Sequence, residues 1–277
     1  MSGALHAELL STRKRPGVWV IGAAWTAMAV AFGMAVPYIV YLAVKDSPPA
    51  DREKLIGGLL PDQFVSSTVG LYPLFGSALM LVLGVIITGG DYRWGTWGTL
   101  LVQRAGRPAA VLGKSGATAV ALLCITVVVM AATAVASMLI AVAEGRPQHW
   151  PGAATVLGGI GAAWLMSMTA ASLGMFLAVL FRGTGAAIAA GLLWLLAVEN
   201  LVSGIAGSLP ALKPLQRLLI SPNGGSLASA LAPAGAQSSV PGLVSVSGPL
   251  TAGLVLGGYV VVLTALSILL INRRDSS

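Results

Sequence analysis

The sequence has few charged side chains and almost no cysteine or histidine. Charged residues make up 9% of its 277 residues, against about 25% in an ordinary soluble domain. A chain this poor in charge cannot cover its surface with polar groups, which favours a lipid bilayer as its surroundings. The single cysteine, Cys124, cannot form an internal disulfide. His6 and His149 have no cysteine or acidic partner at ligand spacing, so we predict no metal site.

Motifs for catalysis are also missing from the sequence. No nucleophile has a plausible base, which argues against a hydrolase. The tripeptide Gly113-Lys114-Ser115 resembles the end of a phosphate-binding loop, but that motif needs a glycine where this chain has Pro108. It also needs a preceding strand, which the sequence does not predict. We therefore expect a chain that is not an enzyme, with no catalytic residue, no bound cofactor and no bound ATP.

What the sequence does have is a series of long apolar runs, and 56% of all residues are hydrophobic. A helix of roughly 20 apolar residues is long enough to cross a bilayer. We predict an all-α integral membrane protein that forms a single transmembrane domain over residues 1–277. Its predicted spans are at about 17–44, 67–90, 110–143, 153–181, 184–203 and 249–271. The first run is too long for the apolar part of a cleaved signal peptide, so we expect it to be retained as a span.

The distribution of charge predicts how these spans are oriented. With the N-terminus in the cytoplasm, the cytoplasmic segments carry ten basic and three acidic residues, whereas the outer segments carry six of each. The whole net charge of +7 then lies on one face, as the positive-inside rule requires. A basic chain can also be a nucleic-acid binder, but charge confined to one set of loops favours membrane topology. We expect both termini in the cytoplasm and no nucleic-acid partner.

Two segments outside the spans have predicted structure. Residues 1–16 are expected to form a short cytoplasmic interfacial helix with Leu5 and Leu9 on one face and Pro16 as its stop; a disordered basic leader is the alternative. Residues 204–247 contain five prolines yet stay largely apolar. Irregular backbone at membrane depth is tolerated where protein surrounds it. We predict short, broken or re-entrant helices on the outer side, with an apolar unstructured loop as the alternative.

A polar island at 91–107 separates the second and third spans. Asp91 is suited to cap the start of a helix, Trp94, Trp97 and Leu101 form one apolar stripe, and Gly106 is a plausible stop. The island is predicted to be a cytoplasmic coupling helix that docks on another protein. An ordinary loop with tryptophans anchored at the membrane interface is the alternative. The residues predicted to couple to the partner are Asp91, Arg93, Trp94, Gly95, Thr96, Trp97, Leu101 and Arg104.

Glu199 is the one acidic residue inside a predicted span. It lies roughly 24 Å along a helix from Gly183, at about 1.5 Å per residue, which places it towards the outer leaflet. Acids inside membranes are candidates for function. Three roles are open: a packing contact with the re-entrant segment, a conduit or gating residue, and a proton-coupling site. The neighbouring Asn200 is expected to share whichever polar contact Glu199 makes.

Several short motifs together resemble a known family. The segment "DYRWGTWGTLL…GRP…LGKSGA" is similar to the signature loop of ABC-2 type transporter permeases, in which the position of Asp91 is more often a glutamate. The N-terminal "AELLSTRKRPGVW", the "VENLVSGIAGSLP" that contains Glu199 and the C-terminal "INRRD" are also similar to the family pattern. In the signature loop, the matching positions are Asp91, Arg93, Gly95, Thr96, Arg107, Gly113 and Lys114.

The resemblance implies an ABC-2 exporter fold and a set of partners. Family members pair as homo- or heterodimers and rest on two cytosolic ATP-binding subunits, which carry the ATP and magnesium. This chain would then be a permease subunit in the plasma membrane of a bacterium, in contact with membrane lipid, and would export a hydrophobic or amphipathic substrate. An ion-coupled secondary transporter that uses Glu199 and a non-transporting scaffold or sensor are the two alternatives.

Overall fold

The computed structural model describes residues 2–44, 48–93, 107–206, 208–232 and 245–274. Within these ranges the chain is helical and contains no strand. Six helical segments are long and apolar enough to cross a membrane, namely Pro16–Ala43, Phe64–Tyr92, Pro108–Ala143, Ala153–Phe181, Gly185–Ala206 and Pro249–Arg273. The prediction of an all-α chain with six spans is confirmed at this level, and the six apolar helices indicate a protein embedded in a membrane.

The N-terminal helix and the first span meet at a proline. Helix α1 (Ser2–Lys14) ends just before Pro16, and Pro16 is the first residue of α2 (Pro16–Val30), where its missing N–H costs no hydrogen bond. The π-helical turn η1 (Ala31–Ala35) then leads into α3 (Val36–Ala43). The wide turn lies where the ring of Pro37 would otherwise clash with the preceding helical turn.

The second span repeats this arrangement. After α4 (Pro49–Gly57), the chain forms α5 (Phe64–Gly70), the π-helical turn η2 (Tyr72–Gly76) and α6 (Ser77–Arg93). Pro73 lies inside η2. Both spans thus contain a π-helical turn within or next to which a proline lies.

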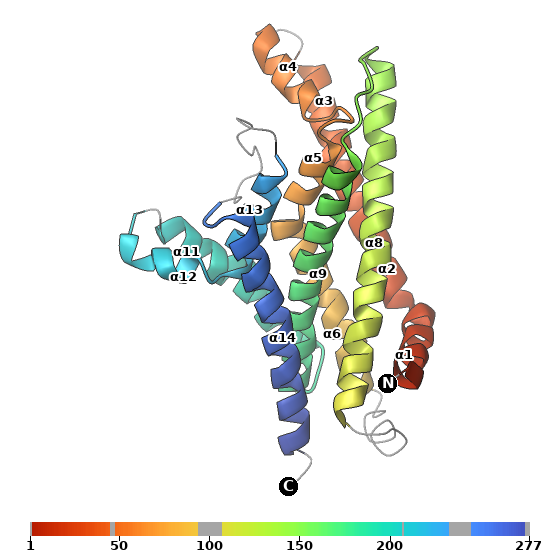
Figure 1. Cartoon of the computed structure of the whole chain (residues 1–277), viewed down its shortest axis with the longest axis vertical. Helices are drawn as coiled ribbons and strands as arrows, with labels where there is room; N and C mark the ends of the chain where they lie inside the picture. Colours follow the sequence, from red (N-terminus) through yellow and green to blue (C-terminus); the bar gives the residue numbers. More distant parts are fainter. Residues whose placement is uncertain (1, 45–47, 94–106, 207, 233–244, 275–277) are drawn as a thin grey trace.

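The third and fourth spans are unbroken helices. They are α8 (Arg107–Ala143) and α9 (Ala153–Phe181). Helix α8 has 37 residues, roughly 55 Å at about 1.5 Å per residue, which exceeds the 30 Å or so of a bilayer's hydrocarbon core. At the end far from the termini, α8 extends alongside α3 and α4 (Figure 1).

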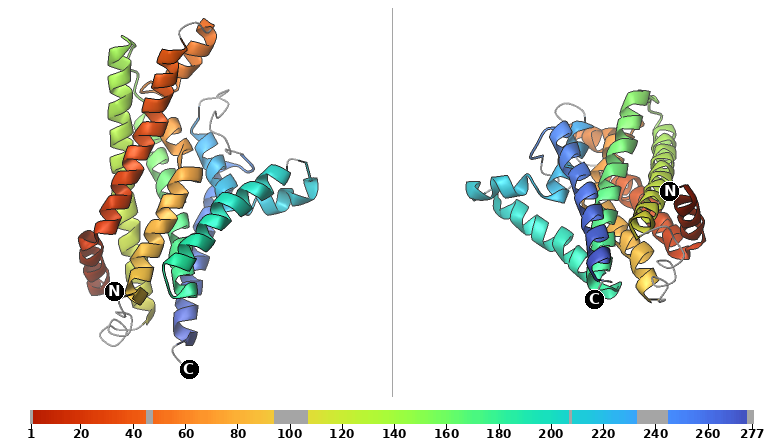
Figure 2. Two further views of the ribbon diagram at one scale, coloured as in Figure 1. Left: turned by 180° about the vertical axis from the view of Figure 1, so that it is seen from behind. Right: turned by 60° about the horizontal axis from the view of Figure 1, so that its bottom comes forward.

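The fifth span leaves the bundle at a steep tilt, as both Figure 1 and Figure 2 show. It consists of α10 (Gly185–Leu192), the π-helical turn η3 (Leu193–Val198) and α11 (Glu199–Ala206). Three short helices follow, η4 (Pro210–Leu212), α12 (Lys213–Gln216) and α13 (Ile220–Ala230). The last span is α14 (Pro249–Arg274). The predicted short helices before this span are therefore present in the described part of 204–247.

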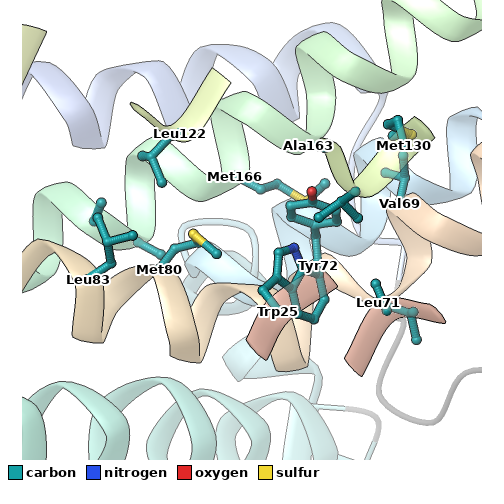
Figure 3. Packing of buried hydrophobic residues seen from close by; sticks show 14 of the residues in the cluster. Trp25, Val69, Leu71, Tyr72, Met80, Leu83, Leu122, Met130, Ala163 and Met166 are labelled. Atoms are coloured by element: carbon teal, nitrogen blue, oxygen red, sulfur yellow. The ribbon is translucent and has the colours of Figure 1, made fainter. Parts of the chain in front are cut away.

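Helices α6 and α9 lie close together, and glycines make this approach possible. A Cβ atom on Gly84 would lie 2.1 Å from the carbonyl oxygen of Ala171, and one on Gly174 would lie 2.2 Å from that of Leu81. Small residues allow such contact between membrane helices. Around this pair lies a continuous apolar core, in which Trp25 and Tyr72 meet edge to face with ring centroids 5.0 Å apart (Figure 3).

Polar contacts tie α3 and α4 to the end of α8. The hydroxyl of Tyr38 donates to the carboxylate of Glu144 at 2.8 Å, and that of Tyr41 donates to it at 3.1 Å. The guanidinium of Arg146 forms two hydrogen bonds with Glu53, at 2.9 and 2.7 Å. The carboxylate of Glu53 raises the pKa of Arg146 above its usual value. Because this ion pair is exposed, it contributes little to stability.

Candidate functional site

Four charged side chains meet at the end of the bundle that carries both termini, and we call them the ion cluster: Glu8, Arg15, Asp91 and Lys114. The ammonium of Lys114 lies 2.6 Å from one carboxylate oxygen of Asp91 and 3.4 Å from Glu8. The other oxygen of Asp91 lies 2.6 Å from the guanidinium of Arg15. The cluster thereby joins α1, the start of α2, the end of α6 and the first turns of α8, which gather at this end in Figure 1.

Burial makes the loss of any one member of the ion cluster costly. The exposed fractions of Glu8, Asp91 and Lys114 are 4%, 4% and 2%, and Arg15 is partly exposed. Among the side chains that the structure describes here, two carboxylates face two cations. Charges removed from water persist only when paired, and removing one member of such a pair costs about 3–5 kcal/mol because an uncompensated charge stays behind.

Arg15 also contacts the backbone of α6. Its guanidinium donates hydrogen bonds to the carbonyl oxygens of Ile86 and Ile87, close to the C-terminal end of that helix. A cation is favourable there because a helix C-terminus carries partial negative charge. Arg15 thus fixes the junction of α1 and α2 to α6 through both a carboxylate and the backbone.

The structure corrects one prediction made for this region. Asp91 does not cap the start of a separate helix, because it lies in the last turn of α6, which continues to Arg93. On α1, Glu8 and Thr12 are buried, whereas Leu9 is only partly buried. Helix α1 therefore packs on the protein through a face that includes these two polar residues, and its predicted position on the membrane surface stays a prediction.

The rest of the polar island falls outside the described residues. Arg93 ends α6, and nothing is described of its side chain. The predicted coupling helix at 91–107 is thus untested beyond its two ends, which belong to α6 and α8. The predicted coupling residues that lie outside the described ranges are Trp94, Gly95, Thr96, Trp97, Leu101 and Arg104.

A second buried polar site, the Glu199 junction, joins the fifth span to α13. Glu199 has no exposed surface. Its carboxylate accepts hydrogen bonds from the indole N–H of Trp194 at 3.0 Å and from the backbone N–H groups of Ile220 at 3.2 Å and Ser221 at 2.7 Å. Those two N–H groups begin α13, whose own N-cap residue, Leu219, makes no side-chain cap. Glu199 therefore acts as a cap supplied by another helix.

The π-helical turn η3 brings Trp194 and Glu199 together. These residues are five apart in the chain, and a π-helix places residues at that spacing one above the other. Of the three roles predicted for Glu199, the packing contact with the segment before the last span is the one that its geometry shows. The prediction for Asn200 is wrong, because its amide donates to the carbonyls of Leu195 and Leu196 in its own helix.

Helix α13 is held by further polar contacts that sequence reasoning missed. The amide of Asn223 donates to the carbonyls of Arg217 and Leu219, and its oxygen accepts from Ser247 at 3.0 Å. The hydroxyl of Ser226 accepts from the backbone N–H of Val246 at 2.9 Å. In the sequence, Asn223 and Ser226 are visible as polar residues in an apolar stretch, but the sequence does not show which groups they bond to.

A small cavity lies next to Lys114. It has a volume of about 10 Å³, close to what one water molecule occupies. The residues that line it include five with hydroxyl groups, from four spans: Thr88, Ser115, Ser172, Thr264 and Ser267. Among the described residues, the buried hydroxyls of Thr88 and Ser172 have no hydrogen-bond partner. The surface of the cavity is nevertheless mostly apolar.

These features define the chain as a six-span helical membrane protein with buried charge at the end that carries its termini. Within the described ranges, no group of three or more histidine, cysteine or acidic residues is placed to hold a metal ion. The chain belongs to the DUF2705 family, a family of proteins of unknown function, whose model matches residues 26–277. No curated protein matches the sequence.

Proposed function

We propose that this chain is the membrane-spanning permease subunit of an ATP-binding cassette exporter of the ABC-2 type. The order of its segments supports the proposal: a helix before the first span, six apolar helices, and short helices before the last one. The observation that carries it is the ion cluster. The cluster joins α1 to α6, which precedes the predicted coupling segment, and to α8, which follows it.

The ion cluster gives a physical route by which a partner could move the bundle. A cytosolic protein pressing on 91–107 would act on the end of α6 and the start of α8 at once, because Asp91 and Lys114 hold them together. Helix α6 in turn lies in backbone contact with α9 at Gly84 and Gly174. Tightly packed helices shift as units, so the displacement would reach the centre of the bundle instead of ending in a loop.

The chemistry of ATP hydrolysis is assigned to the partner. The sequence of this chain contains no complete phosphate-binding loop, and two cytosolic ATP-binding subunits would bind below a pair of permease subunits. The spans have largely apolar walls, which suits lipids, hydrophobic drugs or amphipathic peptides better than sugars. Export as the direction follows from the family resemblance.

The ion-coupled alternative receives no specific support from Glu199. An acid that carries a coupling ion must exchange it during transport. Both carboxylate oxygens of Glu199 are engaged by N–H donors that hold α13 in place. In our proposal Glu199 holds α13 against the fifth span through these hydrogen bonds and does not carry an ion. Asn200 has no part in the transport pathway.

The test is reconstitution with the ATP-binding subunit. We expect a neighbouring reading frame to encode such a subunit, which co-purifies with this chain. In proteoliposomes, the complex should move a fluorescent amphiphile only when ATP is hydrolysed. Flux that continues with hydrolysis blocked and collapses with an ion gradient would favour the secondary transporter, and the absence of any flux would favour the scaffold or sensor.

A further inference from the structure

Two cations stand alone in the last third of the chain. Between Glu199 and Arg273 the only charged residues are Lys213 and Arg217. Both are exposed, on or directly after α12. In the part of the chain that the structure describes, neither has an ion-pair partner. Such isolated cations in an apolar stretch are found where the side chain can reach the membrane–water interface.

The backbone that carries these cations is held firmly. The carbonyl of Arg217 accepts a hydrogen bond from the amide of Asn223 at 2.8 Å, and that of Leu218 accepts one from the hydroxyl of Tyr259 at 2.9 Å. Gln216, the last residue of α12, is buried and packs this short helix against the protein. The two cationic side chains are therefore presented from a fixed position at the tip of the tilted fifth span (Figure 2).

Exposed leucines surround the cations. Leu209, Leu215 and Leu218 have exposed fractions of 52%, 46% and 57%. An interfacial segment combines apolar side chains, which enter the acyl region, with lysine and arginine, which meet the headgroups. We call the set Leu209, Lys213, Leu215, Arg217 and Leu218 the cationic arm.

We propose that the cationic arm binds the phosphodiester headgroup of an anionic phospholipid. Lys213 and Arg217 are four residues apart and on the same arm, so one or two lipid phosphates can contact both, while the leucines contact the acyl chains. Charge complementarity favours this occupant, since the cationic arm contains two cations and no acid. The proposal requires only that the chain is embedded in a membrane, and it is independent of the proposed transport function.

Native mass spectrometry of the detergent-solubilised full chain tests the proposal, with phosphatidylglycerol and phosphatidylcholine as probes. We expect the wild type to retain phosphatidylglycerol in preference to phosphatidylcholine. Each of Lys213→Gln and Arg217→Gln should lower the retained phosphatidylglycerol about fivefold, the effect of one cation near an anionic membrane surface. Lys54→Gln removes one exposed positive charge from α4 and should leave retention unchanged. Equal effects from all three variants, or no preference between the lipids, would overturn the proposal.

A spin label at Leu215 supplies a second, independent readout. In a Cys124→Ala background, Leu215→Cys carrying a nitroxide should report an interfacial depth in nanodiscs that contain phosphatidylglycerol. A label fully accessible to a water-soluble relaxation agent would place the cationic arm off the membrane. Efficient Leu215→Cys cross-linking between two copies would assign this face to a contact between subunits. Either result would overturn lipid binding.

Discussion

At the ion cluster two buried carboxylates face two cations, whereas at the Glu199 junction one buried carboxylate faces an indole and two backbone N–H groups. The first arrangement joins helices through formal charge and the second through neutral donors. Loss of a cation from the cluster leaves an unpaired ion, while loss of the Glu199 charge leaves only neutral donors. The two regions therefore differ in how much a single substitution costs and in what it disturbs.

The largest expected effect comes from Lys114→Met. The substitution keeps most of the side-chain volume but leaves Asp91 and Glu8 short of one positive charge in a buried place. We expect a loss of about 3–5 kcal/mol in the free energy of unfolding, measured by denaturant titration in micelles. Lys54→Met, at an exposed position, is the control and should change it by no more than about 0.5 kcal/mol. Equal effects at the two lysines would show that the ion cluster does not hold this end together.

Glu199→Gln should have an intermediate effect. Glutamine matches the shape of glutamate, but its amide nitrogen is a donor and faces N–H groups that need an acceptor. An unsatisfied buried donor costs about 1–3 kcal/mol, and we expect that loss together with weakened transport. The neighbouring Asn200→Ala serves as the control, because Asn200 bonds only to its own helix among the described contacts. Full activity and normal thermal stability of Glu199→Gln would show that the junction is incidental.

The smallest effect is expected at the exposed pair of Glu53 and Arg146. Glu53→Gln should cost about 0–1 kcal/mol, measured by the same titration. Exposed pairs are screened by salt and buried ones much less. Raising the salt concentration to about 1 M should therefore remove the Glu53→Gln difference and preserve that of Lys114→Met. A buried cluster that weakened with salt as much as the exposed pair would contradict the burial described for it.

Local patterns in the sequence predicted much of the fold. Apolar runs mark each of the six spans. The prolines between 204 and 247 predicted short helices, and Glu199 was expected to reach that segment. Each of these signals can be read from residues that are neighbours in the sequence, compared where needed with the known thickness of a bilayer.

Partners that are distant in the chain could not be predicted in this way. Asp91 follows an apolar run and precedes a polar island, a pattern that fits the end of one helix as well as the start of another. Its position is decided by Arg15 and Lys114, which lie 76 and 23 residues away. Likewise, the π-helical turn η3 directs Glu199 towards α13 but leaves Asn200 bonded to its own helix, a difference that appears only once the turn is known.

The claim at the centre of this account is that a partner's ATP hydrolysis reaches the bundle through 91–107, and the Trp94→Ala/Trp97→Ala variant tests it most directly. The measurement is ATP-dependent flux, and the rate of ATP hydrolysis, in proteoliposomes that contain the permease and its ATP-binding subunit. We predict normal membrane insertion with hydrolysis that no longer drives flux, because the apolar stripe predicted to dock on the partner has been removed. Insertion and coupling that both match the wild type would contradict the account.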